Sequence, residues 1–239
     1  MEATMLKPRL ITATVLVAVF VSALLLLPSP IFLSLVTLVI LVAAWEWGSL
    51  IKISSMLSKF VYLISLFSLL GMASFALDVY GNFEQHLSYQ ICLFTLALWG
   101  VIFLWVQSYP SSAILWGSRS VLAILSIILL LTAWVSVAGI TAFEGGRWLL
   151  LLAVLVVVLA DVGGYIGGKL FGRHKLAPVV SPGKTWEGLF GGLFLQLLLI
   201  IGLKLFIPTL TIISLAILII PVALSSVIGD LFESMIKRY

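Results

Sequence analysis

The chain has 239 residues, of which 63% are hydrophobic and only 9% are charged, and its formal net charge is +4. Soluble globular domains carry about 25% charged residues, so this composition and a mean hydropathy of +1.30 exclude an ordinary soluble fold and indicate a polytopic membrane protein. No polar linker or low-complexity segment divides the chain, so we expect a single transmembrane domain over residues 1–239.

Apolar runs come close to the roughly 20 residues that a helix needs to cross a bilayer. An open sheet would leave backbone groups unpaired in lipid, and the alternating pattern of barrel strands is absent. The sequence therefore predicts an all-α fold, a polytopic integral membrane helical bundle of about eight transmembrane helices. In chain order, the predicted helices cover Leu10–Leu27, Ile31–Trp47, Phe60–Leu77, Ile91–Val106, Val121–Ile140, Trp148–Gly168, Leu189–Ile207 and Leu210–Ile228.

Basic residues fall almost entirely on one side of this topology. Arg147 is in a loop on the other side, and Lys204 is expected to reach the interface at the far end of the seventh helix. The positive-inside rule therefore predicts that both termini face the cytoplasm. The basic residues placed there are Lys7, Arg9, Lys52, Lys59, Arg119, Lys169, Arg173, Lys175, Lys184, Lys237 and Arg238.

A polar segment at residues 161–188 interrupts the apolar pattern. Asp161, Tyr165 and Lys169 are four residues apart and share one helix face. Ionisable groups that adjoin membrane helices indicate a substrate or ion site, and Asp161 is expected to need a metal or a cationic partner. The glycine pairs of this segment, spaced four positions apart, predict close helix packing.

Lys169, Arg173 and Lys175 give the same segment a dense positive charge that suits phosphate groups. We predict that these three residues bind the phosphates of a nucleotide or the headgroups of anionic lipids. The alternative is that they only orient the chain in the membrane, because every cytoplasmic loop of such proteins is basic.

The segment Ser181–Gly188 reads SPGKTWEG. Its Gly-Lys-Thr resembles the end of a Walker A loop, but Pro178 stands where that motif needs glycine, and no strand is expected before it. A P-loop is therefore excluded. The amides at a helix start, together with Lys184, would form a phosphate cradle, and Glu187 would either hold a metal or favour the helix dipole.

A polar stripe ends the last apolar run. Asp230 and Glu233 lie three residues apart on one helix face, with Ser226, Ser234 and Lys237 beside them. Two carboxylates at this spacing suit Mg²⁺, which prefers oxygen ligands and bridges phosphate oxygens. The alternative is a helix that simply leaves the membrane.

Three motifs, in their order along the chain, resemble those of the bacterial phosphatidate cytidylyltransferase (CDP-diglyceride synthase) family. The resemblance covers nearly the whole chain and implies an inner-membrane enzyme with its active site facing the cytoplasm. Such an enzyme joins CTP and phosphatidic acid into CDP-diacylglycerol and pyrophosphate, uses Mg²⁺, is often a homodimer, and has no nucleic-acid partner. The motifs are Asp161-Val162-Gly163-Gly164-Tyr165, Ser181–Gly188, and Gly229-Asp230-Leu231-x-Glu233-Ser234-x-x-Lys237-Arg238.

The spacing of the polar residues and the resemblance together predict the site. The catalytic residues are predicted to be Asp161, Lys184, Glu187 and Asp230. The Mg²⁺ ligands are predicted to be Asp230, Glu233 and Glu187. The nucleotide and phosphate contacts are predicted to come from Ser181, Gly183, Lys184, Thr185, Lys169, Arg173 and Lys175.

One departure from the family pattern concerns the C-terminal signature. In the family, the signature continues beyond Lys237-Arg238 into a Lys-Asp pair and a His-Gly-Gly stretch, whereas this sequence stops at Tyr239. We therefore expect a truncated polypeptide with weak activity or none. The alternatives to an active enzyme are a non-catalytic membrane pseudoenzyme or scaffold, and a secondary transporter, although a transporter should show internal repeats and helices broken near mid-membrane.

Overall fold

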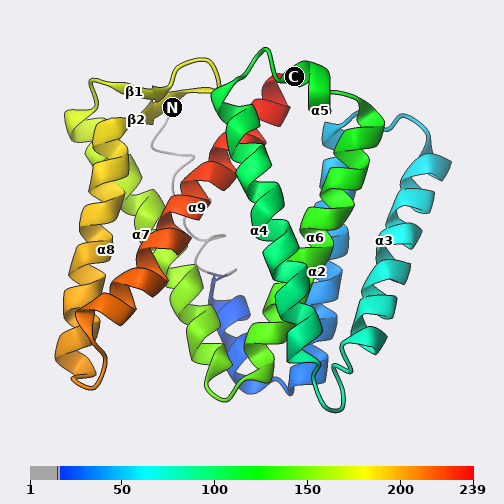
Figure 1. The fold of residues 1–239 in the computed structure, drawn as a ribbon, viewed down its shortest axis with the longest axis horizontal. Helices are drawn as coiled ribbons and strands as arrows, with labels where there is room; N and C mark the ends of the chain where they lie inside the picture. The colour runs from blue at the N-terminus through cyan, green and yellow to red at the C-terminus, as the bar shows by residue number, and fades with distance from the viewer. Residues whose placement is uncertain (1–14, 16) are drawn as a thin grey trace.

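The computed structural model describes residues 15 and 17–239 (Figure 1). Within this part of the chain, seven helices are long and apolar enough to cross a membrane, which confirms the polytopic helical bundle. They are α2 (Ser29–Leu50), α3 (Met56–Ala76), α4 (Gln85–Gln107), α6 (Arg119–Ala142), α7 (Gly146–Phe171), α8 (Trp186–Phe206) and α9 (Ile212–Arg238).

The first predicted helix, Leu10–Leu27, lies partly outside the described residues, as do Lys7 and Arg9. Its described part contains a short apolar helix at Val17–Leu26. The other seven predicted helices each correspond to one observed span, so the total of eight stays a prediction.

Hydroxyl side chains cap several helices at the ends where apolar runs alone gave uncertain boundaries. The Ser118 hydroxyl accepts from the Val121 amide just before α6, and the Thr211 hydroxyl accepts from the Ser214 amide just before α9. Such caps satisfy amides that lack a partner in the first helical turn. The last helix also continues ten residues beyond its predicted end at Ile228, to Arg238, so its polar stripe is helical.

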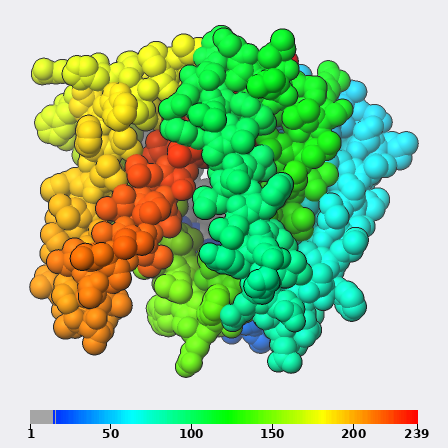
Figure 2. Space-filling view, in the orientation of Figure 1, coloured from blue at the N-terminus to red at the C-terminus, as the bar shows by residue number. Residues whose placement is uncertain are grey.

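The spanning helices form two groups (Figure 1). In the first group, α2, α3, α4 and α6 pack through large side chains, including Leu66, Leu70 and Trp134. In the second group, α7 and α8 lie side by side and α9 crosses them at an angle. Figure 2 shows α9 running across this face of the molecule between α8 and α4.

Glycines let α7 and α8 pack backbone against backbone. A Cβ atom added to Gly163 would lie 2.5 Å from the backbone oxygen of Gly191, and one added to Gly191 would lie 2.5 Å from that of Gly163. A Cβ on Gly167 would lie 2.7 Å from the backbone oxygen of Glu187. The close packing predicted from the glycine spacing is thus confirmed.

Helix α9 joins the two groups. Its first half packs Ile219 and Ala223 against Ala160 of α7. Its second half inserts Phe232 and Met235 among residues of α2, α4 and α6. The two ends of one helix therefore fix the second group against the first.

A two-stranded antiparallel hairpin connects α7 to α8. Its strands are β1 (Lys175–Ala177) and β2 (Ser181–Thr185), and Lys175 pairs with Thr185. The expectation that no strand precedes Lys184 was therefore wrong. The signal was missed because β1 has only three residues and β2 contains Pro182 and Gly183, which are uncommon within strands. The exclusion of a P-loop still rests on Pro178.

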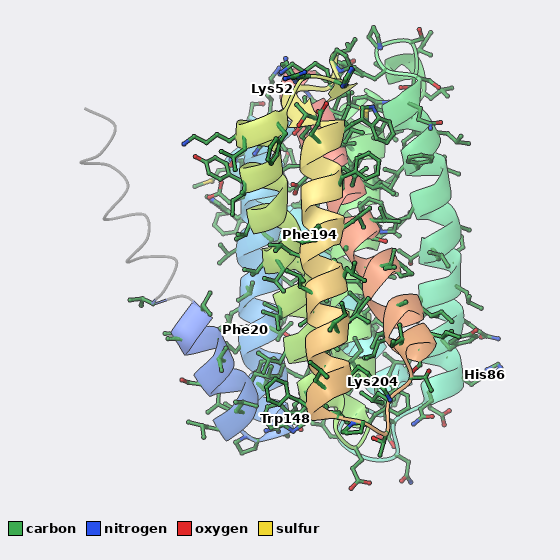
Figure 3. All side chains as sticks on the ribbon, turned by 90° about the vertical axis from the view of Figure 1, so that its left-hand side faces the viewer. Phe20, Lys52, His86, Trp148, Phe194 and Lys204 are labelled. Carbon is green, nitrogen blue, oxygen red and sulfur yellow. The ribbon has the colours of Figure 1, made fainter. Side chains whose placement is uncertain are left out.

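The hairpin, the short helix α5 (Ala113–Trp116) and the end of α9 share one end of the bundle (Figure 1). Lys52 lies at this hairpin end, whereas Trp148 and Lys204 lie at the opposite end (Figure 3). The ammonium of Lys204 donates to the Pro208 carbonyl there, at 2.6 Å. Among the described residues, Lys52 and Lys204 thus lie at opposite ends of the bundle, as the sequence predicted for a multi-pass membrane protein.

Candidate active site

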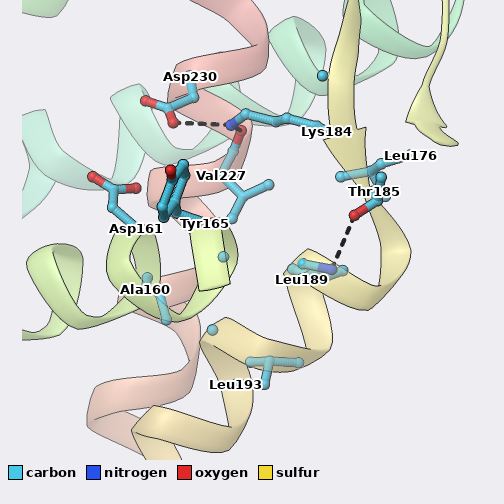
Figure 4. A pocket seen from close by; sticks show the side chains of 15 residues that line it. Ala160, Asp161, Tyr165, Leu176, Lys184, Thr185, Leu189, Leu193, Val227 and Asp230 are labelled. Carbon is cyan, nitrogen blue, oxygen red and sulfur yellow. Dashed lines mark hydrogen bonds and ion pairs between the residues drawn. The ribbon is translucent and has the colours of Figure 1, made fainter. Parts of the chain in front are cut away.

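A cavity of about 210 Å³ lies between α7, α8, α9 and the hairpin (Figure 4). Its polar wall includes Asp161, Lys184 and Asp230, and its apolar wall includes Leu189 and Val227. Pockets for whole ligands usually enclose about 300–1,000 Å³. A cavity of this size therefore suits one part of a larger substrate, such as its phosphate groups.

The packing of α7 on α8 places Asp161 on the cavity. Gly163 and Gly167 face α8, so Asp161, Gly164 and Tyr165 line the neighbouring face of α7. The ammonium of Lys169 lies 5.5 Å from the centre of the Tyr165 ring. Tyr165 was noted for its spacing from Asp161 but was not predicted as a site residue, although that spacing of four was the signal for it.

Lys184 and Asp230 meet across the cavity. The Lys184 ammonium donates to Oδ2 of Asp230 at 2.9 Å and to the Val227 carbonyl at 3.5 Å (Figure 4). The Lys184 side chain is 26% exposed and that of Asp230 is 51% exposed. Ion pairs this exposed add at most about 1 kcal/mol to the stability of the fold. The pair therefore matters less for stability than for the positive and negative charges that it places in the cavity.

Thr185 forms the junction between the hairpin and α8. It is buried, and its hydroxyl accepts from the Gly188 amide at 3.1 Å, which caps the helix. Gly183, Thr185 and Gly188 all line the cavity. Lys184 of the predicted phosphate cradle therefore lies at the cavity wall, but two amides of the helix start already have partners: the Gly188 amide donates to Thr185 and the Trp186 amide donates to the His174 carbonyl.

Several predicted site residues lie elsewhere. Glu187 contacts His174 through its carboxylate, and Glu233 pairs with Lys237 at 2.5 Å. Over residues 15 and 17–239, there is no group of three or more His, Cys, Asp or Glu residues placed to hold a metal. Of the predicted site carboxylates, two line the cavity, Asp161 and Asp230. The other predicted contacts absent from its lining are Ser181, Lys169, Arg173 and Lys175.

Comparison with known proteins shows the family of the chain. The model of the cytidylyltransferase family matches residues 7–239, nearly the whole chain. The chain belongs to this family. No solved structure matches the chain.

Among its relatives, the phosphatidate cytidylyltransferase of Haemophilus influenzae is 35% identical over 252 residues, which cover 98% of this chain and 86% of the relative. That of Pseudomonas aeruginosa is 33% identical, over 98% of this chain and 84% of the relative. That of Staphylococcus epidermidis is 43% identical over 100 residues, or 41% of this chain and 38% of the relative. The family recognised in the sequence is thus confirmed, and the names of the relatives support an enzyme, a nucleotidyltransferase; they do not favour a transporter or a scaffold.

Proposed function

We propose that the chain transfers a cytidylyl group from CTP to phosphatidic acid, giving CDP-diacylglycerol and pyrophosphate. The meeting of Lys184 and Asp230 beside Asp161, in one cavity of a cytidylyltransferase-family membrane protein, is the observation that carries this proposal. The names of the relatives that match 98% of the chain support the choice of phosphatidic acid as the acceptor.

The chemistry needs charge stabilisation more than a strong base. A phosphate oxygen of phosphatidic acid attacks the α-phosphorus of CTP in line. A new P–O bond forms, the bond to the β-phosphate breaks, and pyrophosphate leaves with the electron pair. The Lys184 ammonium is placed to stabilise negative charge on the transferring phosphates, and Asp230 holds that ammonium in the cavity.

We propose that Mg²⁺ binds at the same wall of the cavity. This ion binds one or two carboxylates and completes its shell with water and substrate phosphates, and Asp161 and Asp230 supply two carboxylates. When bound, Mg²⁺ would neutralise phosphate charge. The metal roles of Glu187 and Glu233, and the phosphate roles of Ser181, Lys169, Arg173 and Lys175, stay predictions.

The two walls of the cavity suit the two ends of a lipid substrate. Leu189, Leu193 and Val227 line its apolar part, where the lipid tails would enter between helices from the bilayer. CTP would arrive from the hairpin end, which we place in the cytoplasm because the basic residues gather there. Residence in the inner membrane and a homodimer are further parts of this proposal.

The direct test is conversion of radiolabelled phosphatidic acid to CDP-diacylglycerol in membranes that contain the chain. Product should require both CTP and Mg²⁺, and Asp230→Ala should abolish it. Glu144→Ala, which removes an exposed carboxylate from the loop between α6 and α7, is the matched control and should keep the wild-type rate. Well-inserted wild-type protein without any product would contradict the proposal and favour the pseudoenzyme, which nucleotide binding without turnover would identify.

A further inference from the structure

Glu187 faces away from the cavity. Together with Gly163, Gly167 and Gly191, it lines a groove on the other side of the α7–α8 pair. Thr185 and Leu189, two residues before and after it, are on the cavity side (Figure 4). This geometry therefore disfavours direct contact between the Glu187 carboxylate and a substrate phosphate in the cavity.

The partner of Glu187 is His174, the residue just before the hairpin. Oε1 of Glu187 lies 2.6 Å from the His174 ring nitrogen Nδ1. The His174 backbone amide also donates to Oε1 and Oε2, at 3.1 and 3.2 Å. The Glu187 side chain is only 22% exposed, although that of His174 is 80% exposed. The Glu187 carboxylate therefore makes three polar contacts with His174.

A fourth hydrogen bond closes this junction. The Trp186 amide donates to the His174 carbonyl at 2.9 Å. Both backbone polar groups of His174 are therefore bonded to residues 186 and 187. The strand pairing begins at the next position, where Lys175 pairs with Thr185.

The hairpin depends on contacts at its ends. Strands of three and five residues with an irregular register give it few ladder bonds, and isolated two-stranded hairpins are marginally stable. Arg238 holds the far end by donating to the Val180 carbonyl. His174 and Glu187 hold the near end, three residues from Lys184.

We propose that Glu187 is a positioning residue. Through His174 it fixes the start of the hairpin, so that β2 presents Lys184 to Asp230 in the cavity. The expected effect of this role on turnover rests on the proposed function. The contacts between Glu187 and His174 that define the role do not depend on the substrate. It differs from the metal and catalytic roles predicted for Glu187 from the sequence.

The first test compares turnover of four variants. Glu187→Ala should lower kcat/KM for CTP about tenfold, because a charged hydrogen bond is lost. Glu187→Gln should recover most of the rate, since its amide oxygen still accepts from the His174 amide. His174→Ala should lower kcat/KM for CTP about threefold. The double variant, Glu187→Ala with His174→Ala, should be no slower than Glu187→Ala alone, because the two residues act through one contact.

The concentration of Mg²⁺ for half-maximal rate separates positioning from ligation. It should stay within about twofold of wild type in every variant, because none of them removes a ligand. If Glu187→Gln is as slow as Glu187→Ala and both need far more Mg²⁺, while His174→Ala behaves as wild type, Glu187 is a metal ligand and the proposal is wrong.

A second test needs no activity. Trypsin cleaves after Arg173 and Lys175, and cleavage within an ordered segment requires local opening. In detergent micelles, Glu187→Ala should raise the cleavage rate at these positions about fivefold or more, with Glu187→Gln between it and wild type and Glu144→Ala unchanged. Unchanged cleavage in Glu187→Ala would overturn the positioning role, whereas a wild-type chain that makes no product would overturn only the proposed function.

Discussion

The two helix groups hold together in different ways. Between α7 and α8 the backbones touch at glycines, with Gly163 against Gly191. Within the first group, large side chains fill the space and buried hydroxyls bond across helices, as Tyr62 does with Ser126 at 2.7 Å. The backbone-packed group therefore leaves room for charged side chains beside its helices, whereas the side-chain-packed group supports the site through α9.

The largest expected effect breaks the site and leaves both groups folded. Lys184→Met should lower kcat about 100- to 1,000-fold, as loss of one preorganised charge donor does in other enzymes, and should leave the far-UV circular dichroism unchanged. Lys204→Met, at the opposite end of α8, is the matched control and should keep the wild-type rate. A fall of less than tenfold in Lys184→Met would remove this lysine from the chemistry.

The next effect is on the glycine contact itself. Gly163→Ala places a Cβ 2.5 Å from the Gly191 oxygen, and overpacking of this kind costs about 1–3 kcal/mol of unfolding free energy. Unfolding by sodium dodecyl sulfate in mixed micelles, followed by circular dichroism, measures this cost. Gly71→Ala in α3 is the control, because no described atom beyond the neighbouring backbone of its own helix lies within 4 Å of its added Cβ. Equal stability of the two variants would contradict the comparison.

A smaller effect should come from the first group. Tyr62→Phe removes the hydrogen bond to Ser126, whose hydroxyl keeps its bond to the Ala123 carbonyl at 2.7 Å. The unfolding free energy should fall by about 0.5–1.5 kcal/mol, measured in the same micelles, and kcat should stay within about twofold of wild type. A large loss of activity at unchanged stability would show that the first group takes part in the chemistry.

The smallest effect is expected on the exposed surface near the cavity. Lys169→Gln should raise KM for CTP about two- to threefold at low salt, and the difference should vanish at high salt, because exposed charges act by screened attraction. Rate measurements over a range of salt concentrations test this. A hundredfold loss of kcat at every salt concentration would instead place Lys169 in direct contact with the nucleotide, as the sequence alone predicted.

The helical spans were predictable because lipid imposes a strong constraint. A run of about 20 apolar residues has few other stable states in a bilayer, so the seven described spans match the apolar pattern. The hairpin had no comparable signal, because its strands are too short for alternation and contain Pro182 and Gly183.

Only part of the cavity lining was predictable as a set of residues, and its geometry was not. Charges near membrane helices pointed to Asp161, Lys184 and Asp230, and the structure places all three in the lining of one cavity. The pairing of Lys184 with Asp230, 46 residues apart, depends on how α9 crosses α8. The side of α8 on which Glu187 lies depends on how α8 is rotated about its own axis. The glycine contacts with α7 set this rotation, and the spacing of polar residues in the sequence does not show it.

We propose that substrate phosphates bind in the cavity between α7, α8, α9 and the hairpin. The most direct measurement is labelling by a water-soluble maleimide of Gly183→Cys in a Cys92→Ser chain, with and without CTP and Mg²⁺. Gly183 lines the cavity, is exposed, and has room for a side chain among the described atoms. CTP should slow this labelling at least about fivefold and leave Glu144→Cys unaffected. Equal labelling of Gly183→Cys at saturating CTP would contradict the account.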